Sequence, residues 1–145
     1  MTNNGWLDQT TRLYLDSNIV IYYVQGEENL QRRVDAVLTD ALSRNVELIA
    51  NEIVVCECLY GAYRLARPEV EAAYRSFFFD AGIVTVVPAD FPLLNAAARI
   101  GAAKGLKLLD ASHYCSAVDS GCECLITNDR KFVSDETLRI LQLGE

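Results

Sequence analysis

The sequence predicts an α/β fold, a three-layer α/β/α sandwich with a central, mainly parallel sheet of four to five strands. Its 145 residues match the length of one ordinary domain, and 51% of them are hydrophobic, which is enough for a core. Short runs rich in β-branched residues alternate with longer stretches whose apolar residues recur at helical spacing. Strands separated by helices pair in parallel, and the helices cover both faces of the sheet. We therefore expect residues 1–145 to form a single domain.

The expected strands are five short apolar runs, of which the last is the weakest. They are residues 12–16, 46–50, 83–87, 124–127 and 138–141. Between them, apolar residues at intervals of three and four predict helices. The residues that define these helical faces are Leu30, Val34, Val37, Leu38 and Ala41, then Val54, Cys58 and Leu65, then Leu93, Ala97 and Ile100. Residues 1–11 are polar and predict an N-terminal extension outside this pattern.

The composition argues against several classes of protein. The longest apolar runs, 19–24 and 83–89, are far too short to cross a bilayer, and residues 1–11 do not resemble a secretory leader. Five cysteines with one histidine argue against both a disulfide framework and structural zinc, so we expect reduced thiols and a cytoplasmic protein. The formal net charge of −7 also argues against a simple nucleic-acid binder, which usually has a basic surface. An acidic nuclease would need cations at its site or a basic protein partner.

Two acidic residues directly follow predicted strands. Asp16 follows the apolar run 13–15 of the first strand, and Asp129 follows residues 125–128 at the end of the fourth. The carboxyl ends of parallel strands meet at one edge of the sheet, where ligands bind in open α/β folds. Taken singly, each aspartate is explained better as the cap of a following helix, which is the commonest role of an aspartate at that position.

Two further acids are harder to explain by structure alone. Glu57 lies in a predicted helix, and its neighbours three and four positions away are mostly apolar, so its side chain emerges from an apolar face. A buried, unpaired carboxylate is costly and usually has a partner or a metal ion. Helical side chains lean toward the N-terminus, which directs Glu57 back toward the sheet edge. Asp110 begins the next predicted helix, where an N-cap and a site residue are equally good interpretations.

The four acids together predict a metal site, and we take them as the candidate catalytic and metal-binding residues: Asp16, Glu57, Asp110 and Asp129. At an effective dielectric of about 20, two like charges roughly 4 Å apart cost about 4 kcal/mol, so converging carboxylates need protons or a cation. Oxygen ligands favour Mg²⁺ or Mn²⁺. Such an ion activates water and stabilises the leaving oxygen in phosphodiester hydrolysis.

Other polar residues near these acids have possible supporting roles. Short side chains that could orient the carboxylates or metal-bound waters, or simply form turns and caps, are Ser17, Asn18, Thr127 and Asn128. Cations that could contact RNA phosphates are Lys107, Arg130 and Lys131. His113, three residues after Asp110, is either a general acid or base or, as a lone histidine more often is, a packed residue.

The order of these motifs resembles the PIN-domain nucleases and, within them, the VapC-type toxins of type II toxin–antitoxin pairs. Residues 13–22 look like the opening strand and first acid of the family, and residues 57–61 are similar to its Glu-Leu-x-x-Gly helix. Residues 105–111 resemble the segment with the third acid, and residues 125–132 the closing Thr-Asn-Asp block. Where the family usually has an apolar residue after the third acid and its alanine, this chain has Ser112.

The resemblance implies a PIN-like fold over the whole chain after about residue 11. It implies an RNA-cleaving endonuclease that depends on Mg²⁺ or Mn²⁺, usually forms a homodimer and is held inactive by a cognate antitoxin. Asp16, Asp110 and Asp129 would then correspond to metal-binding or metal-orienting positions, and Glu57 to the remaining acid.

Other interpretations remain open at the level of sequence. A receiver-type phospho-acceptor domain would have paired acids after the first strand, but Asp16 stands alone. A haloacid-dehalogenase-type phosphatase would have a second aspartate two positions later, where this chain has Asn18. A non-catalytic PIN-fold module that binds RNA or protein is the third alternative, although all four acids are present.

Overall fold

All five expected runs form strands in the computed structural model, which describes residue 5 and residues 8–144. The strands are β1 (Arg12–Leu15), β2 (Glu47–Asn51), β3 (Val84–Val87), β4 (Cys124–Thr127) and β5 (Arg139–Gln142). They make one sheet in the order β3-β2-β1-β4-β5, and every neighbouring pair is parallel. The predicted mainly parallel sheet is confirmed, and the weakest run is its fifth strand.

The central strand is β1, which pairs with a neighbour on each side. Leu13 lies opposite Leu48 of β2 and opposite Cys124 of β4. Because all strands run in the same direction, their carboxyl ends lie along one edge of the sheet. A receiver-type domain has the strand order 2-1-3-4-5, so the observed order contradicts that alternative.

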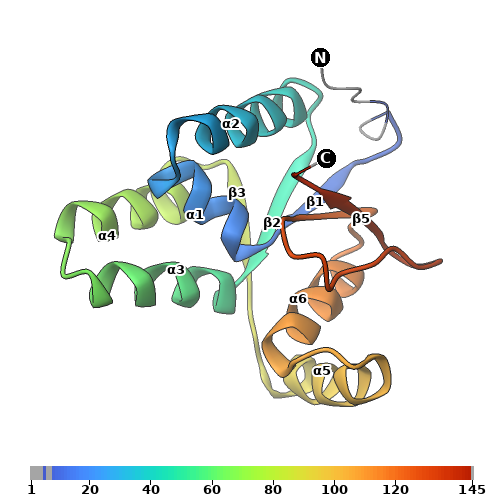
Figure 1. The fold of residues 1–145 in the computed structure, drawn as a ribbon. Coiled ribbons are helices and arrows are strands. Elements are labelled where there is room, and N and C mark those ends of the chain that lie inside the picture. The colour runs from blue at the N-terminus through green and yellow to red at the C-terminus, as the bar shows by residue number, and fades with distance from the viewer. Residues whose placement is uncertain (1–4, 6–7, 145) are drawn as a thin grey trace.

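Six α-helices and one short π-helical segment connect the strands in the described part of the chain. They are α1 (Ser17–Gln25), α2 (Glu28–Ser43), α3 (Glu52–Arg64), α4 (Pro68–Arg75), η2 (Ser76–Asp80), α5 (Phe91–Lys104) and α6 (Leu108–Asp119). Helix α1 packs with α2, α3 and α4, while α5 packs with α6 (Figure 1).

The two groups of helices lie on opposite faces of the sheet, and this arrangement follows from the order of the strands. The connections from β1 to β2 and from β2 to β3 step in one direction, and the connection from β3 to β4 steps back past both. Since parallel crossovers are right-handed, reversing the step moves the connecting helices to the other face. Helices α1 to α4 therefore form one outer layer and α5 and α6 the other, which confirms the three-layer sandwich (Figure 1).

The core surrounds the central strands. Leu13, Tyr14 and Leu15 are fully buried, and so is almost all of β4, as expected of parallel strands covered on both faces. A second, smaller apolar cluster lies between α5 and α6. All five cysteines are free thiols, and only Cys56 among them is exposed.

Some local expectations from the sequence are wrong. Leu65, expected on a buried helical face, is the C-cap of α3 and is 55% exposed. Asp110, expected to begin a helix, lies inside α6 rather than at its start. The π-helical segment η2 has no signal in the spacing of apolar residues.

The predicted N-terminal extension, residues 1–11, lies partly outside the described residues. Its described end is held against the fold, because the backbone N–H and hydroxyl of Thr11 donate to the carboxylate of Glu123 at 3.0 and 2.8 Å. Asp8 also forms an ion pair with Arg44. Among the helices that the structure describes, none has the length and apolarity needed to span a membrane.

Candidate active site

Asp16 is the most firmly held of the four acids. It directly follows β1 as the N-cap of α1 and is only 4% exposed. Its Oδ1 accepts the backbone N–H of Ser17 at 2.8 Å, and its Oδ2 accepts the hydroxyl of Thr127 at 2.6 Å and the amide of Asn18 at 3.2 Å. The cap and the site are therefore the same residue, and the helix N-terminus stabilises its negative charge.

Thr127, at the end of β4, joins two of the acids. Its hydroxyl is fully buried, donates to Asp16 and accepts the backbone N–H of Asp129 at 2.9 Å. The carboxylate of Asp129 in turn accepts the backbone N–H of Lys131 at 2.9 Å. One threonine thus fixes the spacing between the ends of β1 and β4.

The four predicted orienting residues differ in what they contact. The side chains of Thr127 and Asn18 reach Asp16 directly. Asn128 acts one step away, because its backbone N–H donates to the Asn18 side chain at 3.1 Å while its own amide donates to the Tyr22 hydroxyl. Ser17 reaches Asp16 through its backbone N–H.

Asp110 lies in the first turn of α6, three residues after the N-cap position at Lys107. The N-cap interpretation of Asp110 is therefore wrong. Burial raises the pKa of its carboxyl group, and the charges of Asp129 and Asp16 raise that pKa further, while His113 and Lys131 partly offset the shift. The three aspartates consequently lie near enough for their charges to act on one another.

Glu57, from α3, meets the same site through His113 of α6. Its Oε1 lies 2.9 Å from Nε2 of His113, and that nitrogen lies 3.9 Å from Oδ1 of Asp16. The histidine side chain is 1% exposed and that of Glu57 is 32% exposed. One imidazole therefore links the acid on α3 with the acid at the end of β1.

His113 is the residue that the sequence left undecided between a packed side chain and a functional one. It is buried, as a packed side chain would be, and it also contacts two of the candidate acids. The signal that could have singled it out is its spacing, because the third residue after Asp110 shares a helical face with it.

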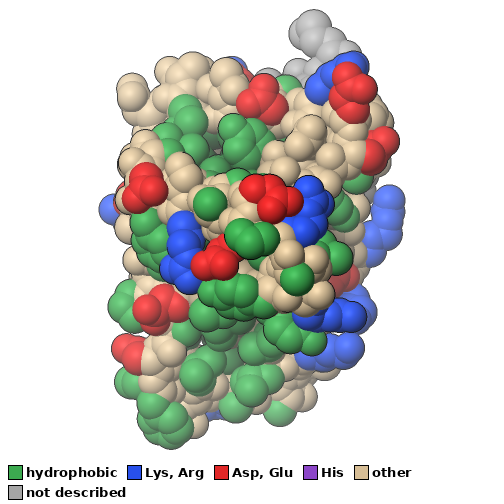
Figure 2. All heavy atoms as spheres, turned by 90° about the vertical axis from the view of Figure 1, so that its left-hand side faces the viewer, with side chains coloured by type: hydrophobic (Ala, Val, Ile, Leu, Met, Phe, Trp, Pro, Cys, Tyr) green, Lys and Arg blue, Asp and Glu red, His purple; other side chains and the backbone are tan. Residues whose placement is uncertain are grey.

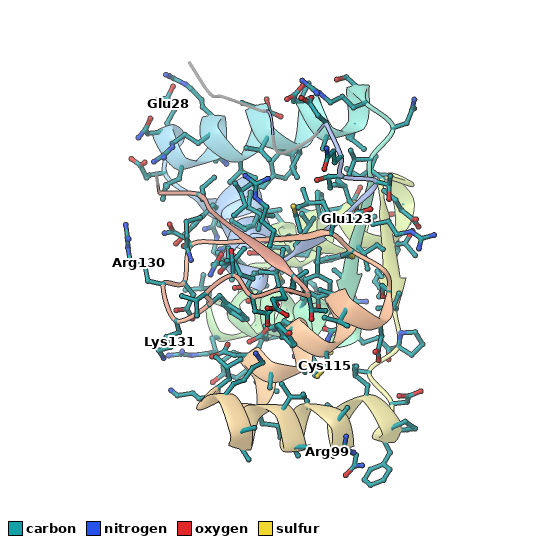
Figure 3. All side chains as sticks on the ribbon, turned by 90° about the vertical axis from the view of Figure 1, so that its right-hand side faces the viewer. Glu28, Arg99, Cys115, Glu123, Arg130 and Lys131 are labelled. Carbon is teal, nitrogen blue, oxygen red and sulfur yellow. The ribbon has the colours of Figure 1, made fainter. Side chains whose placement is uncertain are left out.

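The three candidate cations for RNA are all exposed. Lys131 is the one whose charge reaches the acids, because it lowers the pKa of Asp110. Figure 3 shows Arg130 and Lys131 extending from the loop after β4, with Arg130 directed out from the body of the protein. Lys107 lies at the N-terminus of α6.

The chemistry of the donor set fits a hard divalent cation. The candidate ligands are carboxylate oxygens. Burial and, after it, the charges of Asp129 and Asp16 raise the pKa of Asp110, and a bound cation would offset the repulsion between these charges. Within the described part of the chain, no three His, Cys, Asp or Glu side chains stand close enough together to ligate one ion directly. Mg²⁺ usually keeps several waters and takes only one or two carboxylates, so the donor set suits this mode of binding.

Comparisons with known proteins identify the fold independently. A sequence model of the PIN domain family matches residues 13–134. No curated protein matches the chain in sequence.

Solved structures with the same fold include toxin–antitoxin proteins. VapBC from Salmonella typhimurium bound to DNA is 22% identical with a TM-score of 0.70, covering 91% of this chain and 98% of that one. VapBC2 from Rickettsia felis, bound to a DNA fragment from its promoter, is 17% identical with a TM-score of 0.66, covering 90% and 98%. VapC20 from Mycobacterium tuberculosis, a toxin that cleaves the sarcin–ricin loop, is 11% identical with a TM-score of 0.65, covering 78% and 86%.

Proposed function

The chain belongs to the PIN domain family, and from that premise we propose that it is a metal-dependent endoribonuclease that hydrolyses RNA phosphodiester bonds. We take residues 1–145 as one nuclease domain. The observation that carries the proposal is the convergence of acids from separate elements on the carboxyl edge of the sheet. The charges of Asp129 and Asp16 act on Asp110, and Glu57 reaches the same place through His113.

The acids supply a site for Mg²⁺ or Mn²⁺, which Asp16, Asp110 and Asp129 would hold directly or through metal-bound waters, with Glu57 as the fourth acid. When bound, a divalent ion of this kind supplies an activated water and neutralises charge on the phosphate and the leaving oxygen. Thr127 and Asn18 keep the Asp16 carboxylate in one orientation by donating to the same oxygen. An oxygen ligand that does not need to reorganise binds a cation with a smaller loss of entropy.

The cations near the acids would position the RNA backbone. Lys131 is close enough to act on Asp110, and Lys107 opens the helix that contains it. Such cations place a phosphate without reading its base, so they support the binding of RNA without sequence preference. They also reduce the repulsion between RNA and a chain whose formal net charge is −7.

We propose that the biological role is that of a VapC-type toxin, with a cognate antitoxin as its inhibitor and a homodimer as its assembly. The similar structures from Salmonella typhimurium and Rickettsia felis are VapBC complexes, and the net negative charge suits a basic partner. Helix α3 exposes the aromatic and aliphatic side chains of Tyr60, Tyr63 and Leu65, and hydrophobic side chains gather between charged ones on that side of the molecule (Figure 2). Exposed groups of this kind are commonly covered by a partner.

The nuclease proposal is tested with purified protein and mixed RNA in the presence of Mg²⁺, Mn²⁺ or a chelator. We expect cleavage that requires the metal and that Asp16→Asn and Asp110→Asn both abolish. Asp80→Asn is the matched control, because Asp80 is an exposed acid that precedes β3 and so lies toward the opposite edge of the sheet. Cleavage that survives in both site variants would assign the activity elsewhere. Metal-dependent RNA binding without cleavage would favour the non-catalytic module.

A further inference from the structure

A buried series of hydrogen-bonded side chains leads from the start of α3 to the candidate active site. The contacts of Asn51 fix which group donates and which accepts at the first bond of the series. Asn51 is fully buried and is the N-cap of α3, with its Oδ1 accepting the backbone N–H of Val54 at 3.0 Å. A backbone N–H only donates, so this contact fixes which end of the amide is the oxygen. The Nδ2 of Asn51 must then donate to the hydroxyl of Ser116, 3.0 Å away.

The next links are Ser116 and Tyr14. Because the Ser116 oxygen accepts from Asn51, its own hydrogen is free to bond to the Tyr14 hydroxyl. The same phenol oxygen accepts the backbone N–H of Asn51 at 3.2 Å. Burial raises the pKa of Tyr14 well above its ordinary value, so the phenol keeps its hydrogen. Both lone pairs of the phenol are used, and its hydrogen remains for a third partner.

That third partner is Nδ1 of His113, 3.0 Å from the Tyr14 hydroxyl. If Tyr14 donates there, Nδ1 carries no hydrogen, and the neutral ring has its hydrogen on Nε2. That nitrogen faces Oε1 of Glu57 at 2.9 Å.

We propose that His113 is a positioning residue, held as its Nε2–H tautomer by the Asn51–Ser116–Tyr14 series, and that it holds the Glu57 carboxylate beside Asp16. The acid needs such a partner, because its side chain is 32% exposed and can turn toward solvent. Histidine and carboxylate pairs of this type orient groups around metal ions in many proteins. The inference rests on the proposed function only in giving Glu57 a role in the reaction.

The tautomer is measured without metal or RNA. His113 is the one histidine in the sequence, so long-range proton–nitrogen NMR correlation of the metal-free protein reports on this ring alone. We expect the neutral ring to carry its hydrogen on Nε2 and none on Nδ1. Tyr14→Phe removes the hydroxyl that selects this state, and we expect a mixture of tautomers in the folded variant. A neutral ring with its hydrogen on Nδ1 in the wild-type protein would overturn the proposal.

The positioning role is measured by a pair of substitutions at His113. His113→Gln retains an amide N–H that can donate to Glu57, while His113→Leu removes the donor and keeps an apolar side chain. We expect His113→Leu to lower kcat by about 10–100-fold with little change in KM, and His113→Gln to recover much of that loss. Equal activity of the two variants would overturn the role of Glu57 positioning. If the wild-type protein itself does not cleave RNA, the proposed function fails, whereas the tautomer experiment still decides the structural part.

Discussion

The candidate site has two walls that are built in different ways. The strand-end wall consists of Asp16, Asn18, Thr127 and Asp129, which follow β1 and β4 and bond to one another directly. The helix wall consists of Glu57, Asp110 and His113, which come from α3 and α6. In the strand-end wall, the partners come from the ends of two paired strands and from the residues that directly follow them. In the helix wall, the position of Glu57 depends on a series of buried side chains that ends at the N-cap of α3.

This difference has a physical consequence for how each wall responds to change. The hydrogen bonds between β1 and β4 fix the ends of these two strands relative to each other. The position of Asp16 therefore follows from the fold itself. A glutamate on a helix has several rotatable bonds, and its orientation needs a specific partner. We therefore expect changes in the strand-end wall to affect stability and activity together. Changes in the helix wall should separate the two.

The largest effect is expected at Thr127. Thr127→Val keeps the shape of the side chain but removes a hydrogen bond to the Asp16 carboxylate and leaves the partly buried N–H of Asp129 without its acceptor. We expect a loss of about 3 kcal/mol in the free energy of unfolding, measured by denaturant titration, together with loss of RNA cleavage. Thr85→Val is the matched control, because its exposed hydroxyl also donates to a carboxylate, that of Glu47, and its loss should change stability by less than about 0.5 kcal/mol. Similar losses at the two threonines would contradict the comparison of the walls.

A smaller effect is expected at the helix wall, from the N-cap Asn51. Asn51→Ala removes the α3 cap and the first donor of the buried series, for which we expect a loss of about 2 kcal/mol in the free energy of unfolding. Asp90→Ala removes the cap of α5, whose side chain accepts the N–H of Leu93, and should cost about 1 kcal/mol. Only Asn51→Ala should alter the ring-nitrogen signals of His113. If Asp90→Ala altered them equally, the series would not be the cause.

The strand-end wall is also the part of the site that the sequence predicts best. An aspartate after a β-rich run lies at the sheet edge once the run is a parallel strand, and Asp16 and Asp129 need no further information. The five strands also follow from local patterns, because short runs rich in β-branched residues alternate with stretches of helical spacing. The helix wall depends on which helices meet, because Glu57 and His113 are 56 residues apart and Tyr14 and His113 are 99 apart. No local pattern indicates that pairing, so the role of His113 stayed undecided and Asp110 was placed at the helix start instead of inside it.

Lys131 offers a test of where RNA approaches the two walls. It lies close enough to lower the pKa of Asp110, whereas Arg130 is directed away from the protein (Figure 3). We expect Lys131→Ala, in the inactive Asp16→Asn background, to weaken binding of single-stranded RNA and to reduce the salt dependence of the affinity by about one phosphate contact. Arg130→Ala should change it less. A greater effect of Arg130→Ala would place the RNA farther from the acids, on the outer side of the loop after β4.

The smallest effect is expected from Asp110 in the metal-free protein, and its sign is opposite to that of the other changes. Burial and the charges of Asp129 and Asp16 raise the pKa of Asp110 in the folded chain. As pH rises from the ordinary aspartate pKa to the raised one, the folded chain holds a proton that the unfolded chain has released, so stability falls across that interval. Asp110→Asn has no ionisable group at this position. The variant should be as stable as the wild-type protein in acid but slightly more stable at neutral pH. The effect is small because the carboxylate is partly solvated.

The same variant tests whether a divalent ion binds at the Asp110 carboxylate. Thermal unfolding with a chelator and then with Mg²⁺ should raise the Tm of the wild-type protein, because an ion that binds only the folded state stabilises it by mass action. Since Asp110→Asn already lacks the crowded charge and one oxygen ligand, we expect the ion to raise its Tm much less. Asp80→Asn should respond like the wild type. An equal rise in Tm for all three proteins would mean that the ion binds away from Asp110, and the like charges where the two walls meet would then be balanced by protons alone.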